Sequence, residues 1–429
     1  MKRYFFIMNL CACLWVIISI ILSRYWISEL SQFFNKTIAI IIITGIAYIP
    51  GFLSINLMAS LILINFKPLS RLKNIPISIL IPTLNEEKHI YQTIKSITKQ
   101  DYEGPLNIII VDNGSTDGTL YEVTKAQNDF KIEISLFIEN KKGKNYALNK
   151  GLEQITSPYF ITLDADTTLH KSAISNILST IINSNSFVSA VAGGLLVEND
   201  DSNFLTKMQR FDYALSITSI KNMQSLFAST LVAQGAFSIY HTKTIKDIGG
   251  WDNNIGEDII LTWKLLQQKK LVLFEPRAIG FTVVPEKLSD FIIQRSRWAR
   301  GMIEGLKLIK PWQQGSIYTK YLTFIDLLIP LIDLCYIFVW VPGLVISFFG
   351  LYYIVGPFTL SVLPVLLSCY YLMYAIQKKV VLEPLKINIR FNLLDFFIYI
   401  FVYQTLISFS SIWGYFQEIF NTKRIWKKD

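Results

Sequence analysis

Long apolar segments lie at both ends of the chain and enclose a polar middle. Two segments precede the middle and three follow it: residues 4–23, 37–65, 321–350, 351–376 and 392–418. About 20 consecutive apolar residues suffice for a helix to cross the hydrocarbon core of a bilayer. We therefore predict two membrane helices before the middle and two or three after it, with a kink at Pro50-Gly51.

The polar middle alternates between short apolar runs and helical patterns. Strands are predicted at 76–82, 106–111, 132–138 and 159–163, and helices at 86–99, 119–128, 144–154 and 259–268. This alternation indicates βαβ units around a parallel sheet. Asp112 and Asp164 each directly follow an apolar strand, at the end where such sheets bind ligands.

Residues 288–308 have apolar positions at helical spacing mixed with basic ones, a pattern typical of a helix at a membrane interface. The chain accordingly divides into four predicted parts. These are two membrane helices (1–70), an α/β domain (71–285), interface helices (286–320) and a membrane region with a basic tail (321–429).

The net charge of +9 comes largely from basic residues beside the apolar segments. They are Lys67, Arg71, Lys73, Lys378, Lys379, Lys386, Arg390, Lys423, Arg424, Lys427 and Lys428. Such residues favour the cytoplasmic side of a membrane and anionic lipid; no pattern for nucleic acid accompanies them. All four cysteines lie within apolar runs, so neither a zinc site nor a disulfide framework is expected.

The charge pattern leaves one conflict about the last apolar segment. Two spans before the α/β domain place that domain and the amino terminus in the cytosol, and two spans after it place the basic loop 377–391 there as well. A third span would put the basic tail outside. Residues 392–418 therefore dip in and return, lie at the interface, or cross against the rule.

Asp164-Ala165-Asp166 places two carboxylates on a turn after a strand. Hard divalent cations such as Mg²⁺ bind through one or two carboxylates together with substrate phosphates. A metal held by this pair would offset the charge of a leaving diphosphate. A pair of this kind also occurs on ordinary exposed turns, so its place in a series of motifs matters more than the pair alone.

Other polar residues follow the first two strands or begin a helix. Asp112 is a candidate acceptor for a nucleobase or ribose, or simply the start of an Asx turn. Thr83, Asn85 and Glu86 at the end of the first strand are likewise either nucleotide contacts or structural residues. Asn85 would equally suit a helix cap. Lys144, just inside a helix start, could reach a phosphate or face solvent.

Glu257 and Asp258 precede a predicted helix and form the candidate catalytic pair. In the functional interpretation, Asp258 is a general base that takes a proton from an acceptor hydroxyl. Direct attack by that hydroxyl on an anomeric carbon would invert its configuration. The plainer alternative is that both carboxylates only interact favourably with the helix dipole.

Gln294-Arg295-Ser296-Arg297-Trp298 lies in the predicted interface helix. Arginine pairs well with phosphate oxygens, and a tryptophan face can stack on a sugar ring. Gln294, Arg295, Arg297 and Trp298 are therefore candidate contacts of the acceptor and diphosphate. The alternative is an amphipathic membrane anchor with snorkelling arginines.

Asp326 and Asp333 are seven residues apart within an apolar segment, so they share one helix face. Carboxylates inside a span usually face a polar interior. We expect them to line a route for a polymer; alternatively, Asp326 lies at the interface and Asp333 pairs locally.

The ordered motifs resemble those of the membrane-embedded processive glycosyltransferases of family 2, the group of cellulose, chitin and hyaluronan synthases. Within that group, this chain most resembles the bacterial poly-β-1,6-N-acetylglucosamine synthases. The motifs are Ala147-Leu148-Asn149-Lys150-Gly151, Asp164-Ala165-Asp166, Gly235-Ala236-Phe237-Ser238-Ile239-Tyr240, Gly249-Gly250-Trp251-Asp252, Glu257-Asp258, Thr262-Trp263-Lys264-Leu265, Phe274-Glu275-Pro276 and Gln294-Arg295-Ser296-Arg297-Trp298. The resemblance is strong over residues 75–315, and the flanks match only as apolar spans.

The resemblance implies an α/β GT-A domain inserted between transmembrane helices, and an inverting hexosyltransferase that uses UDP-N-acetylglucosamine. It further implies Mg²⁺ or Mn²⁺, a growing polysaccharide acceptor, and export through the lipid bilayer of the cell membrane. Synthases of this kind often work with a small accessory membrane subunit. Roles carry over to matching residues: the nucleotide to Asp112 and Asp164, the metal to Asp166, the base to Asp258, and the acceptor terminus and diphosphate to Gln294, Arg297 and Trp298.

Four features depart from the pattern of the group. Gly256 stands where threonine is usual, and Asn113 follows Asp112 in place of the more usual residues. Val191-Ala192-Gly193-Gly194-Leu195 differs from the expected synthase pattern, and Arg300-Gly301-Met302 replaces Gln-Gly-Gly. Alternative functions are synthesis of a hyaluronan, chitin or β-glucan type polymer, or non-processive transfer to a lipid carrier. A transporter or scaffold with an inactive transferase domain is disfavoured because Asp164, Asp166 and Asp258 are intact.

Overall fold

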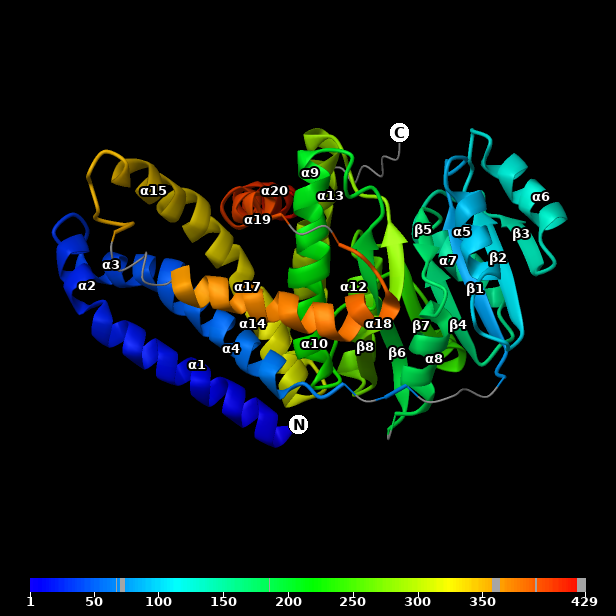
Figure 1. Ribbon diagram of the computed structural model, residues 1–429, viewed down its shortest axis with the longest axis horizontal. Coiled ribbons are helices and arrows are strands. Elements are labelled where there is room, and N and C mark those ends of the chain that lie inside the picture. The colour runs from blue at the N-terminus through cyan, green and yellow to red at the C-terminus, as the bar shows by residue number, and fades with distance from the viewer. Residues whose placement is uncertain (67, 70–73, 185, 357–362, 390–391, 423–429) are drawn as a thin grey trace.

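The computed structural model describes residues 1–66, 68–69, 74–184, 186–356, 363–389 and 392–422. Apolar helices gather on one side of the molecule and a β-sheet lies on the other (Figure 1). Among the basic residues predicted to flank the spans, Lys67, Arg71, Lys73, Arg390 and the tail from 423 lie outside the described residues.

The amino-terminal part is helical, as predicted. Its elements are α1 (Lys2–Leu22), α2 (Arg24–Leu30), α3 (Lys36–Ile43), the π-helical segment η1 (Thr44–Tyr48) and α4 (Ile49–Leu63). Helices α1 and α4 pack closely. A Cβ at Gly51 would stand only 2.6 Å from the indole nitrogen of Trp15, so a larger residue would not fit there. Small residues allow this approach of two apolar helices. Helix α1 and the continuous helix Lys36–Leu63 are both long and apolar enough to cross a membrane.

Prolines accompany three of the π-helical turns in the apolar helices. The segments η1, η4 (Tyr336–Trp340) and η5 (Lys378–Leu382) each end two residues before a proline: Pro50, Pro342 and Pro384. Proline cannot donate to the carbonyl one turn earlier, and its ring crowds that carbonyl. A wider π turn relieves the conflict without breaking the helix. The kink predicted at Pro50-Gly51 is such a turn, placed just before the proline.

An eight-stranded mixed sheet forms the centre of the polar domain, in the order β3-β2-β1-β4-β7-β6-β8-β5. The strands are β1 (Ile77–Thr83), β2 (Leu106–Asp112), β3 (Glu133–Ile138), β4 (Tyr159–Leu163), β5 (Thr167–Leu169), β6 (Val188–Val197), β7 (Phe237–His241) and β8 (Leu271–Thr282). Strands β1 to β4 are parallel, as the alternation predicts. The remaining strands lie where none was predicted, and they make the sheet mixed, because β7 runs antiparallel to both β4 and β6.

Helices cover both faces of the sheet. They are α5 (Ile90–Thr98), α6 (Thr119–Asp129), α7 (Lys144–Gln154), α8 (Ala173–Ile182), α9 (Phe204–Phe211), η2 (Asp212–Ile217), α10 (Thr218–Ser225), α11 (Thr242–Asp247), α12 (Glu257–Gln267) and α13 (Leu288–Leu308). One apolar core joins α5, α6 and α8 to the sheet, and the other joins α7, α12 and α13 to its opposite face. Each fully buried isoleucine of β1 contributes roughly 1.5–3 kcal/mol. The strand ends are therefore held on a rigid support.

Helix α5 begins later than predicted, at Ile90 instead of residue 86. Asn85 adopts a left-handed φ of 54°, and its side-chain oxygen accepts hydrogen bonds from Thr116 instead of capping the helix. The backbone N–H of Glu86 donates to Thr119 Oγ1 at 2.7 Å. The loop after β1 is thus tied to the loop after β2, and the chain cannot turn into a helix until these contacts end.

The carboxyl-terminal part contains η3 (Pro311–Gln313), α14 (Ile317–Cys335), η4, α15 (Val341–Ser347), α17 (Leu363–Gln377), η5, α18 (Glu383–Leu385), α19 (Leu393–Ile398), η6 (Tyr399–Tyr403) and α20 (Gln404–Ile419). Three continuous helices are long and apolar enough to span: Ile317–Ser347, Pro364–Leu385 and Leu393–Ile419. The second differs from the predicted span 351–376. Residues 378–385, predicted to be loop, continue this helix, because Val381 and Leu382 bury apolar surface against β6 and β8.

Both ends of the last apolar helix lie beside the polar domain. Near its start, Asp395 is 4.0 Å from Arg210 of α9; near its end, Glu418 contacts Arg300 of α13. Between them, the backbone at Gly414 lies so close to α13 that a Cβ would stand 2.3 Å from the Ser296 carbonyl oxygen. In Figure 1, α19 and α20 are seen nearly end-on, whereas α1, α4 and α14 run across the view. Residues 393–419 therefore run alongside the predicted interface helix α13.

Candidate active site

The carboxyl ends of β1 and β2 meet at Thr83 and Asp112, which are paired in register. Asp112 is buried, and its carboxylate accepts from Thr83 Oγ1 at 3.3 Å and from the backbone N–H groups of Gly114 and Ser115 at 3.0 and 3.1 Å. The Asx turn considered from the sequence is therefore present. It fixes the carboxylate at the strand end, where a nucleotide would meet the sheet.

The residue after Asp112 positions the start of α7. Asn113 is buried; its amide oxygen accepts from the Gly143 N–H at 2.7 Å and its amide nitrogen donates to the carbonyls of Glu139 and Lys141. Gly143 has a φ of 140°, which favours glycine, and directly precedes Lys144. This departure from the sequence pattern of the group thus builds the loop that aims Lys144.

Lys144 lies between two acidic motifs. Its ammonium is 2.5 Å from Asp164 Oδ1 and 4.0 Å from Glu257 Oε1. Burial alone would lower the pKa of Lys144, but the charges of Asp164 and Glu257 outweigh burial and raise it. Lys144 is therefore a fixed cation within a carboxylate cluster, and the solvated alternative does not describe it.

Asp166 lies close to a second carboxylate. Burial and the nearby Asp164 carboxylate together raise the pKa of Asp166 to about 6, against the opposing charges of Lys144 and His89. In the described part of the chain, no group of three His, Cys, Asp or Glu side chains could hold a metal ion. Two carboxylates that repel each other nevertheless suit Mg²⁺ or Mn²⁺ when substrate phosphates supply further oxygens. The residues fit such a cation.

Glu257 and Asp258 form the first turn of α12, where negative charge interacts favourably with the helix dipole. Burial and the Asp258 carboxylate together raise the pKa of Glu257 to about 7, against the opposing charges of Lys144 and Arg297. Asp258 Oδ1 accepts from the Ile259 N–H at 2.8 Å. Glu257 thus lies within electrostatic range of both Lys144 and Arg297 of α13.

The members of the Gln294–Trp298 motif do different things. Arg295 is buried; it lies 3.3 Å from Asp212 Oδ2 and donates to Tyr403 Oη at 2.9 Å. Burial raises the pKa of Asp212, and the Arg295 charge opposes that rise. The guanidinium also lies over the Trp298 ring, 4.1 Å from its centroid. Arg295 therefore holds α13, η2 and η6 together. These contacts give Arg295 a structural role, whereas the sequence predicted that it contacts the diphosphate.

Arg297 and Trp298 are better placed to meet a ligand. Arg297 is partly exposed and acts electrostatically on Glu257, whereas Trp298 is 38% exposed. Gln294 is partly buried, and its side-chain oxygen has no hydrogen-bond partner within the described structure. A carbohydrate hydroxyl could supply that partner, since buried polar atoms are seldom left unpaired.

A comparison with protein families matches residues 78–249 to the model described as Glycosyl transferase family 2. This segment contains β1 to β7 and the site residues from Thr83 to Asp166. The protein contains a family 2 glycosyltransferase domain. The predicted family is thereby confirmed for this part of the chain.

Named relatives extend the match to 229 residues. The chain is 35% identical over that length to poly-β-1,6-N-acetyl-D-glucosamine synthase from Staphylococcus epidermidis and 33% identical to the synthase of the same name from Staphylococcus aureus strain COL. Each alignment covers 52% of this chain and 54% of the relative. The chain therefore spans about half the length of the curated relatives it matches.

A solved structure shows that the similarity of fold reaches beyond this domain. Mannosyltransferase PcManGT from Pyrobaculum calidifontis, in complex with GDP-Man and Mn²⁺, superposes with a TM-score of 0.61. The superposition covers 90% of this chain and 99% of that protein at 16% sequence identity. The glycosyltransferase domain thus has the GT-A fold, with apolar helices on both sides of it in the chain, as predicted.

Two residues near the site of the glycosyltransferase domain were not predicted. Tyr213 of η2 lies within electrostatic range of Asp166 and Arg297; burial raises its pKa to about 12. Lys221 of α10 donates to the Val232 carbonyl at 3.1 Å, and burial lowers its pKa to about 7, against the influence of Asp258. Neither belongs to a recognisable motif.

The two carboxylates of α14 have different surroundings. Asp333 is buried and accepts from Ser408 Oγ and Tyr415 Oη, both at 2.7 Å. The local-pairing alternative therefore describes Asp333, and the expectation that it lines a polymer route is wrong for this residue. Asp326 stays a candidate for such a route.

Proposed function

We propose that the protein transfers N-acetylglucosamine from UDP-N-acetylglucosamine to a growing polysaccharide, with inversion at the anomeric carbon and with export of the product. The observation that carries the proposal is the meeting of three elements: the strand-end carboxylates, Lys144, and the pair Glu257-Asp258 beside Arg297 of the interface helix. The relatives' printed name, poly-β-1,6-N-acetyl-D-glucosamine synthase, supports the choice of sugar and polymer.

The donor would lie across the ends of β1, β2 and β4. Asp112, Thr83, Asn85 and Glu86 would contact the nucleoside, and Asp164 would orient Lys144 toward the diphosphate. Arg297 adds positive charge within electrostatic range of Glu257. Asp166 with Asp164 would hold Mg²⁺ or Mn²⁺, which offsets negative charge on the leaving diphosphate when bound. The Mn²⁺ in the mannosyltransferase complex supports a metal of this kind.

The transfer step uses a hydroxyl of the acceptor terminus. Its oxygen attacks the anomeric carbon, the bond from that carbon to the diphosphate oxygen breaks, and UDP departs with the bonding electrons. Asp258 takes the hydroxyl proton, as a general base at the start of α12. Trp298 and Gln294 would support the terminal sugar, because the exposed ring offers a stacking face and the amide oxygen needs a donor.

The membrane arrangement follows from the position of the last apolar helix. If residues 393–419 lie at the interface along α13, four spans remain, and the amino terminus, the catalytic domain, the basic segment 378–389 and the end of α20 all share one side. The positive-inside rule makes that side the cytoplasm. This arrangement removes the conflict with the basic tail and agrees with the proposed parts 1–70, 71–285, 286–320 and 321–429.

Membranes that contain the protein, incubated with Mg²⁺ and labelled UDP-N-acetylglucosamine, UDP-glucose or UDP-glucuronate, test the proposal. Polymer formed only from UDP-N-acetylglucosamine is the expected result, and membranes with Asp258→Asn serve as the control. A short, lipid-extractable product would instead establish non-processive transfer to a lipid carrier. Polymer from another donor would replace the sugar assignment. A proposed accessory membrane subunit would raise polymer yield when supplied.

A further inference from the structure

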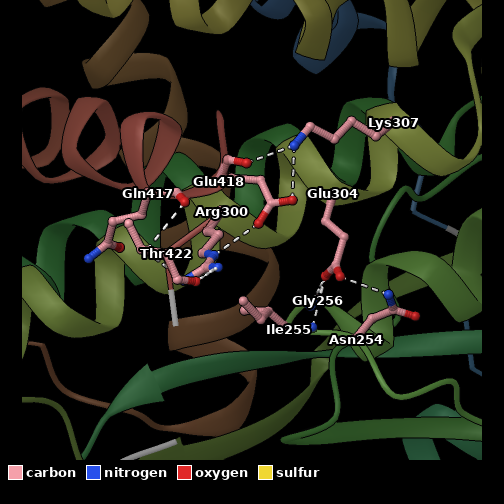
Figure 2. A network of polar contacts seen from close by, with 9 residues as sticks. All are labelled: Asn254, Ile255, Gly256, Arg300, Glu304, Lys307, Gln417, Glu418 and Thr422. Atoms are coloured by element: carbon pink, nitrogen blue, oxygen red, sulfur yellow. Dashed lines mark hydrogen bonds and ion pairs between the residues drawn. The ribbon is translucent and has the colours of Figure 1, made fainter. Parts of the chain in front are cut away.

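A buried glutamate of the interface helix holds the loop that leads to the catalytic pair. Glu304 of α13 is 3% exposed. Its Oε2 accepts from the backbone N–H groups of Ile255 and Gly256 at 2.8 and 3.4 Å, and its Oε1 accepts from Asn254 Nδ2 at 2.8 Å (Figure 2). Three donors of one short loop thus converge on one carboxylate, directly before α12.

The backbones of this loop and of α13 also touch. A Cβ at Gly256 would stand 2.9 Å from Gly301 Cα, and a Cβ at Gly301 would stand 2.8 Å from Gly256 Cα. Glycine at both positions is therefore required for the approach. Two of the departures from the sequence pattern, Gly256 and Gly301 in Arg300-Gly301-Met302, are thus one feature: each glycine accommodates the other.

The same helix is fastened from the side of the last apolar helix. Glu418 accepts from Arg300 Nε at 2.9 Å and from Lys307 Nζ at 3.1 Å, and an Arg300 terminal nitrogen donates to the Thr422 carbonyl at 2.6 Å (Figure 2). Arg300 and Glu304 are four residues apart, so they lie one turn from each other on α13. The helix therefore has a fixed position against α20 when its glutamate holds the loop.

We propose that Glu304 is a positioning residue for the general base. It acts through Asn254, Ile255 and Gly256 and does not touch the substrate itself. Gly256 is the residue before the first turn of α12, and that turn contains Asp258, so a shift of the loop moves the base. The role rests on the proposed function. Glu304 sets the geometry of the proton transfer and leaves the donor site at Asp112 and Asp164 unaffected.

Kinetics of Glu304→Gln test this role. The amide keeps the size of the side chain but offers one acceptor oxygen and adds a donor that faces backbone N–H groups. Because a displacement of about 1 Å can lower a rate 100-fold, we expect kcat to fall about 10- to 100-fold while Kd for UDP changes less than about twofold. Glu153→Gln, the same change at a side chain 67% exposed on α7, should leave both values unchanged.

Gly301→Ala tests the same contact without altering the carboxylate, and it decides the matter if Glu304→Gln does not accumulate. Its Cβ would push against Gly256, so kcat should again fall with UDP binding retained. Wild-type kcat in both variants, or a parallel loss of kcat and UDP binding, would overturn the proposal.

Amide hydrogen exchange separates this inference from the proposed function, because it does not depend on any transfer activity. The amides of Ile255 and Gly256 should exchange faster in Glu304→Gln than in the wild type, and those of the donor-site strand β2 should not change. Unchanged exchange at both loop amides would overturn the inference even if polymer synthesis is established. Absence of polymer from the wild-type protein would instead overturn the proposed function alone.

Discussion

Lys144 Nζ lies 2.5 Å from Asp164 Oδ1 and 4.0 Å from Glu257 Oε1, so one ammonium joins the donor side of the site to its catalytic pair. The cation comes from the start of α7, the first carboxylate from the end of β4 and the second from the start of α12. This junction makes the charge of Lys144 a sensitive point for the binding of a diphosphate.

Lys144→Met should weaken UDP binding at least tenfold, because a buried cluster of carboxylates that loses its cation repels the diphosphate; tenfold corresponds to about 1.4 kcal/mol. Titration of the detergent-solubilised protein with UDP measures the effect. Lys150→Met is the matched control, since Lys150 lies on the same helix, is 39% exposed and pairs only loosely with Glu153 at 3.8 Å. Wild-type affinity in Lys144→Met would contradict the expected role.

Asp258→Asn should lower the transfer rate by about 100- to 10,000-fold, the usual contribution of a general base. UDP affinity should remain close to that of the wild type, because Lys144 and Asp164 stay in place. Radiolabel incorporation and UDP titration on the same preparation separate the two effects. Asp247→Asn changes an exposed carboxylate at the end of α11 and serves as the control. Loss of UDP binding in Asp258→Asn would show that this residue is not the base.

UDP affinity should depend on pH through Glu257, whose pKa burial and Asp258 raise to about 7. Below pH 7 the carboxyl group is protonated and the site is less negative; above pH 7 it is ionised and repels the diphosphate. The ratio of wild-type to Glu257→Gln affinity should therefore approach one at pH 6 and fall as the pH rises to 8. The ratio removes the titration of UDP itself. A ratio that is constant from pH 6 to 8 would be the opposing result.

Arg295 and Arg297 of the interface helix should give opposite phenotypes. Arg295→Met leaves the buried Asp212 without its cation, a change that costs about 3–5 kcal/mol in buried pairs, so thermal unfolding in detergent should begin several degrees lower. Arg297→Met should instead lower transfer with little change in unfolding temperature, because Arg297 is partly exposed. A stable but inactive Arg295→Met would show that Arg295 contacts the diphosphate after all.

The carboxylates of α14 should also separate. Asp333→Asn disturbs the hydrogen bonds to Ser408 and Tyr415 and should lower the unfolding temperature. Asp326→Asn should shorten or slow the exported polymer if this residue lines the route, and sizing of the product outside membrane vesicles measures it. Normal export by Asp326→Asn would show that Asp326 does not line the polymer route.

Local sequence patterns predicted the early elements well, and the reason is physical. Helices α7 and α13 and strand β4 have the predicted bounds, because periodicity and strand-end residues act within a few positions. The same patterns failed where distant contacts decide. The start of α5 moved because Asn85 bonds to a loop about 30 residues away, and the fourth span moved because Val381 and Leu382 pack on the sheet.

The sequence by itself determined the alternation of membrane helices with an α/β domain, the placement of Asp112 and Asp164 at strand ends, and the family of the catalytic domain. Hydrophobic period and short motifs are local properties, so no knowledge of partners was needed. Only the tertiary structure decided that Arg295 pairs with Asp212, that α20 follows α13, and that Glu304 holds the loop before Asp258. Each of these depends on residues about 50 or more positions apart, whose mutual distance is set by packing and not by spacing along the chain.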